Sequence, residues 1–215
     1  MKPDWKNSNV LLPKTLEVLE RLSHLPLLTD YTFIGGSALA FYLAHRQSED
    51  LDFFTWLPTI DKTSIRKTLT ENFKDLHLIS DSDKQQDWTV EGVKVTFFAN
   101  NWEGLKQNEN LKSFLNIGTL PLLIATKINT LFLRAKFRDY YDLYALNKKG
   151  VSIDAIYEYA FEFFPTLNHK LFQMALIYTD DILEDDIAYL KPQYKVKKQT
   201  ISKHFEKEIT KWLKK

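Results

Sequence analysis

The fold is decided by Phe33-Ile34-Gly35-Gly36-Ser37-Ala38-Leu39-Ala40 and by a later stretch, His45-Arg46-Gln47-Ser48-Glu49-Asp50-Leu51-Asp52-Phe53-Phe54. The apolar run from Tyr31 to Ile34 predicts a short buried strand that stops at two glycines. The residues after the glycines have helical composition, so we expect a helix that begins there and ends near Arg46. The alternation of polar and apolar residues from Asp50 to Phe54 then predicts a second strand.

The turn between the first strand and the helix is suited to an anion. Gly35 and Gly36 can adopt positive φ and let a ligand approach the backbone closely. The N–H groups and the dipole of a helix N-terminus favour negative charge, such as that of a phosphate. Ser37, expected at the N-cap, adds a hydroxyl. A Gly-Gly-Ser sequence is also common in ordinary turns, so this half of the pattern has a structural alternative.

Asp50 and Asp52 are predicted to share one face of the second strand, with their Cα atoms roughly 6.5 Å apart. Two carboxylates this close repel each other unless a cation lies between them. Magnesium suits such a pair, because it prefers oxygen ligands and is often completed by substrate phosphates. An Asp-x-Asp sequence can also be a solvated strand face or a turn.

The order and spacing of the two halves are more specific than either half, since twelve residues separate Ser37 from Asp50. Together they predict a phosphate cradle that faces a metal-binding acidic pair. With Arg46 and Ser48 included, the stretch resembles the DNA polymerase β-like nucleotidyltransferases, and more closely the AbiEii/AbiGii toxin family. This resemblance implies an α+β fold: a mixed sheet flanked by helices, followed by a mostly helical C-terminal region.

A second block lies about 75 residues after Asp52. A long helix with Pro121 near its start contains Lys127 in an otherwise apolar turn. Arg134 follows on the same side, and the next helix carries Asp139 and Asp142 on one face. From the residues alone, Lys127 is better explained by a side chain that extends to the surface. Asp139 can equally be a helix cap or form an ion pair with Arg134 or Arg138.

The second block also resembles the AbiEii-like family, and the resemblance covers roughly residues 30–150. It implies that Lys127 contacts a phosphate or transfers a proton, and that a carboxylate lies close to the substrate. Asp142 is the first candidate for this carboxylate and Asp139 is the second. Arg134 is expected to assist nucleotide binding. Gly35, Gly36 and Ser37 would hold the phosphates, and Asp50 and Asp52 would be catalytic and hold Mg²⁺ or Mn²⁺.

One position departs from the polymerase β-like pattern. The strand expected from Val93 to Ala99 usually carries a third carboxylate, and this chain has Thr96 there. A neutral hydroxyl adds no charge to a metal site and is no strong base. Either the active site of this family needs only two carboxylates together with side chains from later in the chain, or this protein is catalytically altered. Glu91, in the expected hairpin turn Glu91-Gly92, is a possible substitute.

The rest of the chain predicts further elements with fewer consequences for function. Helices are expected at Pro13–His24 and Lys62–Phe73, and strands at Leu76–Ser80 and Asp87–Val90. The polar segment from Asn100 to Asn116 predicts a loop with one helical piece. Three more helices are expected near the C-terminus, at Ile153–Phe164, Leu167–Ile177 and Ile201–Leu213.

Composition limits the alternatives. The chain has 215 residues, 44% of them hydrophobic, which is enough for a core in one or two domains; we expect domains at residues 1–118 and 119–215. The absence of cysteine excludes disulfides and thiolate metal sites. No apolar run is long enough to span a membrane and no signal peptide is evident, so a cytoplasmic protein without a membrane partner is expected. The C-terminal 25 residues carry nine lysines and two glutamates. This positive segment could bind the phosphates of RNA, or its lysines could simply lie on the solvated face of a helix.

The resemblance implies a bacterial, metal-dependent nucleotidyltransferase that transfers a nucleoside monophosphate from an NTP to an acceptor hydroxyl. The acceptor would be RNA, with the 3′ end of tRNA as the first candidate, and the enzyme would be a toxin beside a separately encoded antitoxin. Two alternatives remain open. Thr96 is also compatible with a catalytically altered protein that binds a nucleotide or a partner, and other enzymes of this fold modify small molecules such as antibiotics.

Overall fold

The structure is a computed structural model that describes residues 1–134, 136–179, 182 and 186–214. The chain forms two compact units, Met1–Thr119 and Leu120–Lys215. The first unit contains a mixed sheet and the second is helical in its described residues. The predicted α+β class is confirmed. In the part of the chain that the structure describes, no helix combines the length and apolar character needed to cross a membrane.

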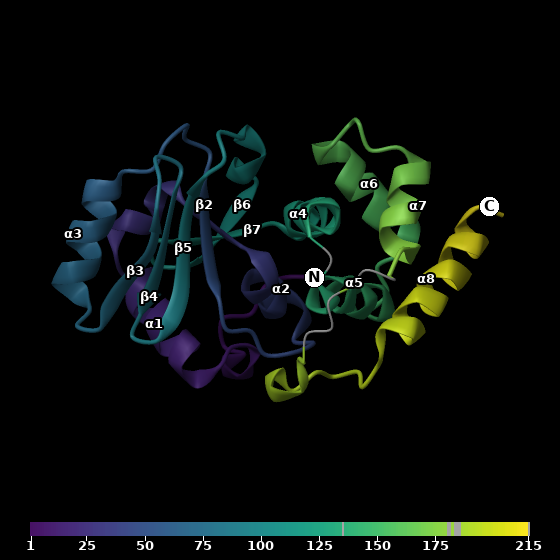
Figure 1. Cartoon of the computed structure of the whole chain (residues 1–215), viewed down its shortest axis with the longest axis horizontal. Coiled ribbons are helices and arrows are strands. Elements are labelled where there is room, and N and C mark those ends of the chain that lie inside the picture. The colour runs from purple at the N-terminus through teal and green to yellow at the C-terminus, as the bar shows by residue number, and fades with distance from the viewer. Residues whose placement is uncertain (135, 180–181, 183–185, 215) are drawn as a thin grey trace. The chain divides into compact units, whose positions relative to one another are not determined.

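The described residues of the first unit build one seven-stranded sheet in the order β3-β4-β5-β2-β1-β7-β6 (Figure 1). β1 pairs in parallel with β7 and β2 pairs in parallel with β5, while the other neighbouring strands are antiparallel. The strands are β1 (Thr32–Ile34), β2 (Leu51–Thr55), β3 (Leu76–Asp81), β4 (Gln85–Val90), β5 (Val93–Ala99), β6 (Asn108–Lys112) and β7 (Leu115–Gly118).

Aromatic rings fill one face of this sheet. Phe33, Phe53 and Phe97 lie on the adjacent strands β1, β2 and β5, with ring centroids 5.4 and 5.6 Å apart. Phe41 of α2 (Gly35–Leu43) packs edge-on against Phe33 at 6.2 Å. All four rings are buried. Because side chains alternate along a strand, the residues between them, including Asp52 and Thr96, lie on the opposite face.

The helices of the first unit begin close to where the sequence predicts. α1 (Pro13–Ser23) has its proline in the first turn, where a missing N–H costs nothing. α3 (Lys62–Asn72) is capped by the Asp61 side chain, which accepts from the Ser64 N–H at 2.9 Å. α2 ends at Leu43, three residues before the expected end at Arg46, because Ala44 adopts a left-handed conformation with φ of 46°.

The prediction for residues 100–116 is wrong in part. The expected helical piece is present as a short 3₁₀ helix, Glu103–Lys106. Within the remainder of the expected loop, residues 108–112 form β6 and residues 115–116 begin β7. β6 is an edge strand with both faces partly exposed, so its sequence Asn-Glu-Asn-Leu-Lys lacks the apolar alternation by which strands are recognised.

The second unit is built from helices that pack in pairs. α4 packs against α5, α6 and α7, and α8 packs against α5, α6 and α7. The last helix, expected at Ile201–Leu213, buries an apolar stripe formed by Ile201, Phe205 and Ile209. The described helices are α4 (Leu120–Leu133), α5 (Phe137–Lys148), α6 (Ile153–Phe163), α7 (His169–Ile177) and α8 (Lys198–Trp212).

Candidate functional site

Gly35 and Asp52 meet where β1 passes into α2. Asp52 is the register partner of Ile34 in the antiparallel β1–β2 pair, so Gly35 lies one residue beyond the paired position. Gly35 has a φ of 80°, and a Cβ atom built on it would lie 2.5 Å from Asp52 Oδ2. Only glycine leaves room for that carboxylate against the backbone. The sequence predicts the approach of a ligand at this glycine; the group that the structure places beside it is the side chain of Asp52.

Three successive residues before β2 are held in place by different partners. The backbone of Ser48 bonds to Val10 and Leu12, in both cases at 3.0 Å. The Glu49 carbonyl accepts from the Thr15 hydroxyl at 3.1 Å, and the Asp50 carbonyl accepts from the Ser37 hydroxyl. The backbone that carries Asp50 and Asp52 is therefore anchored, as a preorganised site requires.

The predicted N-cap role of Ser37 is wrong. α2 begins at Gly35 and its N-cap is Ile34, which provides no side-chain cap. Ser37 is buried within the first turn and donates to Asp50 instead. Gly35, Gly36 and Ser37 are thus the first three residues of the helix, whose N–H groups have no partner inside the helix. An anion is the natural partner for such N–H groups.

Asp50 and Asp52 offer oxygen ligands at an accessible place. Asp52 belongs to β2, Asp50 comes directly before its first residue, and both are partly exposed. Among the described residues, no group of three or more His, Cys, Asp or Glu side chains is placed to hold a metal ion. Carboxylate oxygens suit Mg²⁺ and Mn²⁺, so the chemistry of these two side chains is compatible with such an ion, and the metal site stays a prediction.

Asp87 is a polar residue beside this site for which the sequence predicts no role. The Thr96 hydroxyl donates to Asp87 Oδ1 at 2.7 Å, and Thr96 is the register partner of Asp52 on β2. A signal for this pair was present in the sequence. Glu91 and Gly92 form a two-residue turn with positive φ at both positions, so residues whose numbers add to 183 face each other, including Asp87 and Thr96. Glu91, the possible substitute acid, pairs with Arg21 and accepts from the Lys74 N–H.

In the second unit, Lys127 is held by two buried carboxylates. Its Nζ lies 2.9 Å from Asp139 Oδ1 and 2.9 Å from Asp142 Oδ2. The side chains of Lys127, Asp139 and Asp142 are 7%, 1% and 0% exposed, so Lys127 does not extend to the surface. Arg134 Nε contacts Asp139 Oδ2 at 3.3 Å and is 52% exposed. Of these four side chains, Arg134 carries the accessible charge.

A neighbouring tyrosine is an unsuitable base. Burial, and secondarily the charge of Asp139, raises the pKa of Tyr140 to about 12. Its hydroxyl donates to the Tyr178 carbonyl at 2.9 Å. Tyr140 therefore stays protonated at neutral pH and serves packing and hydrogen bonding.

The predicted residues fall into two groups. The first unit brings together Gly35, Gly36, Ser37, Asp50 and Asp52. The second unit brings together Lys127, Arg134 and Asp142, with Asp139. That the two groups act on one substrate stays a prediction.

The chain is similar to known proteins over most of its length. The sequence model described as "Nucleotidyl transferase AbiEii toxin, Type IV TA system" matches residues 17–101 and 115–212. An uncharacterised protein of Aquifex aeolicus is 23% identical over 202 residues, which cover 92% of this chain and 95% of that protein. The family match thus includes both groups of predicted residues.

Two solved structures share the fold. MenT4, a nucleotidyltransferase toxin of Mycobacterium tuberculosis, superposes with a TM-score of 0.57 at 15% identity, covering 90% of this chain and 82% of MenT4. A proposed nucleotidyltransferase from H. pylori gives a TM-score of 0.54 at 17% identity, covering 94% of this chain and 99% of that one. At these identities the likeness establishes the architecture alone.

Proposed function

The chain belongs to the AbiEii family of nucleotidyltransferase toxins, and from this membership we propose that it transfers a nucleoside monophosphate from an NTP to an RNA hydroxyl. The oxygen of the acceptor hydroxyl attacks the α-phosphorus in line. The bond from that phosphorus to the bridging oxygen breaks, pyrophosphate leaves, and the hydroxyl proton passes to solvent. The 3′ end of tRNA is the first candidate for the acceptor.

The close approach of Gly35 to Asp52 is the observation that carries this proposal. It puts a carboxylate next to the start of α2, where the N–H groups of Gly35, Gly36 and Ser37 favour phosphate oxygens. A carboxylate would repel a triphosphate in this position unless a cation lay between them. The arrangement therefore fits the magnesium complex of an NTP better than a free anion.

Asp50 and Asp52 are the residues that would hold Mg²⁺ or Mn²⁺. When bound, such an ion neutralises charge that builds up on phosphate oxygens. The anchored backbone from Ser48 to Asp50 and the hydrogen bond from Ser37 keep the two carboxylates in a fixed relation. Positioning of this kind accounts for most catalysis of phosphoryl-type transfer.

The cluster in the second unit supplies the positive charge in this proposal. Arg134, half-exposed, is the cation that a phosphate would meet first. Lys127 is oriented by Asp139 and Asp142, so a phosphate that contacts its ammonium group meets a side chain already fixed in place. Asp142, fully buried, acts here by holding Lys127.

RNA is favoured as the acceptor by lysines of the second unit. Lys203, Lys207 and Lys211 recur every four residues on the exposed face of α8, the yellow helix of Figure 1, with a rise of roughly 6 Å between them. Near the start of this helix, a cavity of about 770 Å³ is lined partly by lysines and aromatic rings. In proteins that bind single-stranded nucleic acid, lysines contact the phosphates and aromatic rings stack on the bases. Lining residues of this kind are Phe137, Tyr194, Lys195, Lys197 and Lys198.

The test is an incubation of the purified protein with labelled NTPs, Mg²⁺ and bulk RNA. We expect label in RNA from the wild-type protein and at least about 100-fold less from Asp50→Ala and Lys127→Ala. Label found only on small hydroxylated compounds would replace RNA by a small-molecule acceptor. Nucleotide binding without any transfer would favour the catalytically altered alternative.

As a toxin, the enzyme is proposed to have a separately encoded antitoxin. Growth inhibition on expression in a bacterial host, relieved by a gene next to its own and absent in the Asp50→Ala variant, would support this part.

A further inference from the structure

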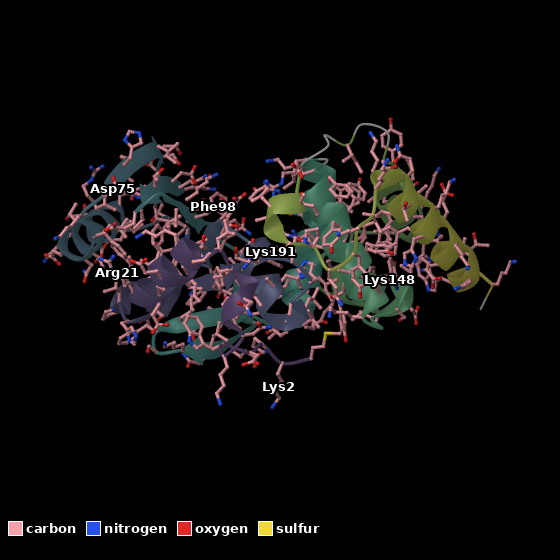
Figure 2. All side chains as sticks on the ribbon, turned by 90° about the horizontal axis from the view of Figure 1, so that it is seen from below. Lys2, Arg21, Asp75, Phe98, Lys148 and Lys191 are labelled. Atoms are coloured by element: carbon pink, nitrogen blue, oxygen red, sulfur yellow. The ribbon has the colours of Figure 1, made fainter. Side chains whose placement is uncertain are left out.

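A row of polar side chains crosses four adjacent strands beside the proposed metal site. Asp52 on β2 is the register partner of Thr96 on β5, Thr96 of Asp87 on β4, and Asp87 of Ser80 on β3. Register partners point to the same face of a sheet. Two residues further on, the Phe54 and Phe98 rings lie on this face with centroids 4.8 Å apart; Phe98 is labelled in Figure 2. The row therefore continues the face that carries Asp52.

The hydrogen bonds within the row orient the Thr96 hydroxyl. A hydroxyl has one proton and two lone pairs. Thr96 donates its proton in a hydrogen bond to Asp87 Oδ1 at 2.7 Å, so its lone pairs point away from that carboxylate. Both residues are buried, at 7% and 8% exposure, which leaves water few ways to loosen this bond.

Asp87 is itself fixed by donors on its other oxygen. Oδ2 accepts from Gln85 Nε2 at 2.7 Å and from the Ser80 hydroxyl at 3.2 Å. An ionised carboxylate only accepts hydrogen bonds, so with these three donors its position is set. Thr96 is consequently held as an acceptor next to Asp52.

The chemistry of this acceptor selects its ligand. A triphosphate has only acceptor oxygens and negative charge, so it cannot donate to Thr96 and is repelled by the carboxylate of Asp87, to which Thr96 is bonded. A sugar hydroxyl is neutral and can donate a hydrogen bond to the oxygen of Thr96, whose own proton is engaged with Asp87. The row is thus suited to the attacking hydroxyl of the acceptor and unsuited to the phosphates of the NTP or to the pyrophosphate that leaves.

We propose that Thr96 binds the attacking hydroxyl of the acceptor and that Asp87 is a positioning residue acting through Thr96. Before attack, the hydroxyl donates a hydrogen bond to Thr96 Oγ1, which aims an oxygen lone pair away from the sheet. As the new bond to phosphorus forms, this proton passes to solvent, because a threonine hydroxyl is too weak a base to keep it. This inference rests on the proposed transfer to an RNA hydroxyl. It explains why a threonine stands at the position where the family resemblance predicts a carboxylate.

The first measurement is binding, so that it does not depend on turnover. The affinity of wild-type protein is compared for bulk tRNA and for the same tRNA ending in a 3′-deoxynucleotide, both with a non-hydrolysable NTP. We expect the 3′-hydroxyl form to bind about 3- to 10-fold more tightly, the effect of one hydrogen bond. Thr96→Val should abolish the preference and Thr96→Ser should keep it. A wild-type protein with no preference would overturn the proposal whether or not it transfers nucleotide.

The second measurement is transfer kinetics. Thr96→Val and Asp87→Ala should each lower kcat/KM for RNA by about 10-fold or more, with NTP affinity within about twofold of wild type. The double variant should be no slower than Thr96→Val, because Asp87 acts through Thr96. Thr89→Val is the matched control, since it removes a hydroxyl from the same strand, β4, at a residue that is not among the hydrogen-bond partners of Asp87, and should stay near wild type.

These results separate the two proposals. A wild-type protein without transfer, but with a 3′-hydroxyl preference that depends on Thr96, would reject the proposed reaction and keep the hydroxyl site. An active wild type with an equally active Thr96→Val variant would keep the reaction and reject the hydroxyl site. Equal losses from Asp87→Ala with and without Thr96 would show that Asp87 acts independently, against the inference.

Discussion

The α-carbon of Gly35 faces the carboxylate of Asp52 so closely that an added methyl group would lie 2.5 Å from Oδ2. Gly92 provides a natural comparison. It has nearly the same φ, 84° against 80°, but nothing lies within 4 Å of its added methyl group. The two glycines therefore separate the need for positive φ from the need for space beside Asp52.

We predict that Gly35→Ala lowers transfer by at least about 100-fold, because the methyl group displaces the Asp52 carboxylate and small misplacements are costly in catalysis. Gly92→Ala should leave transfer near the wild-type rate. Both variants should lose about 1–2 kcal/mol of unfolding free energy, since alanine is strained at positive φ. Denaturant unfolding and initial transfer rates measure the two effects. Equal losses of activity in both variants would mean that space beside Asp52 is unimportant.

The ion cluster of Lys127 can be tested for a role beyond stability. Lys127→Met leaves Asp139 and Asp142 buried without their shared cation, so we predict a loss of roughly 3–5 kcal/mol of unfolding free energy. Adding Asp139→Asn and Asp142→Asn removes the unbalanced charge and should restore most of that loss.

Transfer by this triple variant should nevertheless stay at least about 100-fold below wild type, because no ammonium group is left to contact phosphate. Chemical denaturation and label incorporation on the same samples give both quantities. A triple variant that is stable and fully active would show that the cluster is structural only.

RNA binding through α8 predicts a particular salt dependence. For single strands, the slope of log K against log salt changes by about 0.7 for each phosphate contact. Replacing Lys203, Lys207 and Lys211 by glutamine should therefore reduce the slope by about 2 and weaken RNA binding without changing NTP affinity. Three exposed lysines of the first unit serve as the control set, Lys67, Lys74 and Lys84. If replacing these three control lysines changes the slope equally, RNA binding depends on the net charge of the protein and not on α8.

His204 predicts a weakening of the fold in mild acid. Burial, with help from Lys148 and other nearby lysines and against the charge of Glu208, lowers the pKa of His204 below its ordinary 6.5. Its Nε2 lies 2.7 Å from Asn147 Oδ1. Because the unfolded chain then binds more protons than the folded one, stability should fall as the pH drops below about 6.5.

The measurement is the unfolding free energy between pH 7.5 and pH 5 for wild type and His204→Gln. The wild type should lose more stability over this range than the variant. His77→Gln, at an exposed histidine of the first unit, is the control and should keep the wild-type slope. Parallel curves for wild type and His204→Gln would contradict the prediction.

Much of the fold can be predicted from residues 31–54, because hydrophobic runs, glycines and alternation report directly on strand, turn and helix. β6 could not, since an edge strand with both faces partly exposed needs no apolar side chains. Ser37 was assigned the wrong partner for a related reason. A hydroxyl near a helix start can cap the helix or bond elsewhere, and only the tertiary structure shows that Asp50 lies within reach.

The candidate site shows the same division between local and non-local information. Asp50, Asp52, Lys127 and Asp142 stand out by spacing and by family resemblance, but the pairing of Lys127 with two carboxylates depends on how α4 and α5 pack. Asp87 was missed because a single aspartate on a short strand has no pattern. The hairpin turn that sets its register with Thr96 makes it predictable in principle.

The most direct test of nucleotidyl transfer follows two labels from the same NTP. With α-labelled NTP, RNA should become labelled, and with γ-labelled NTP the label should appear in pyrophosphate and not in RNA. Asp52→Asn should reduce both products by at least about 100-fold while the protein remains folded. Transfer of the γ-label to RNA, or incorporation of the α-label that persists in Asp52→Asn, would contradict the account.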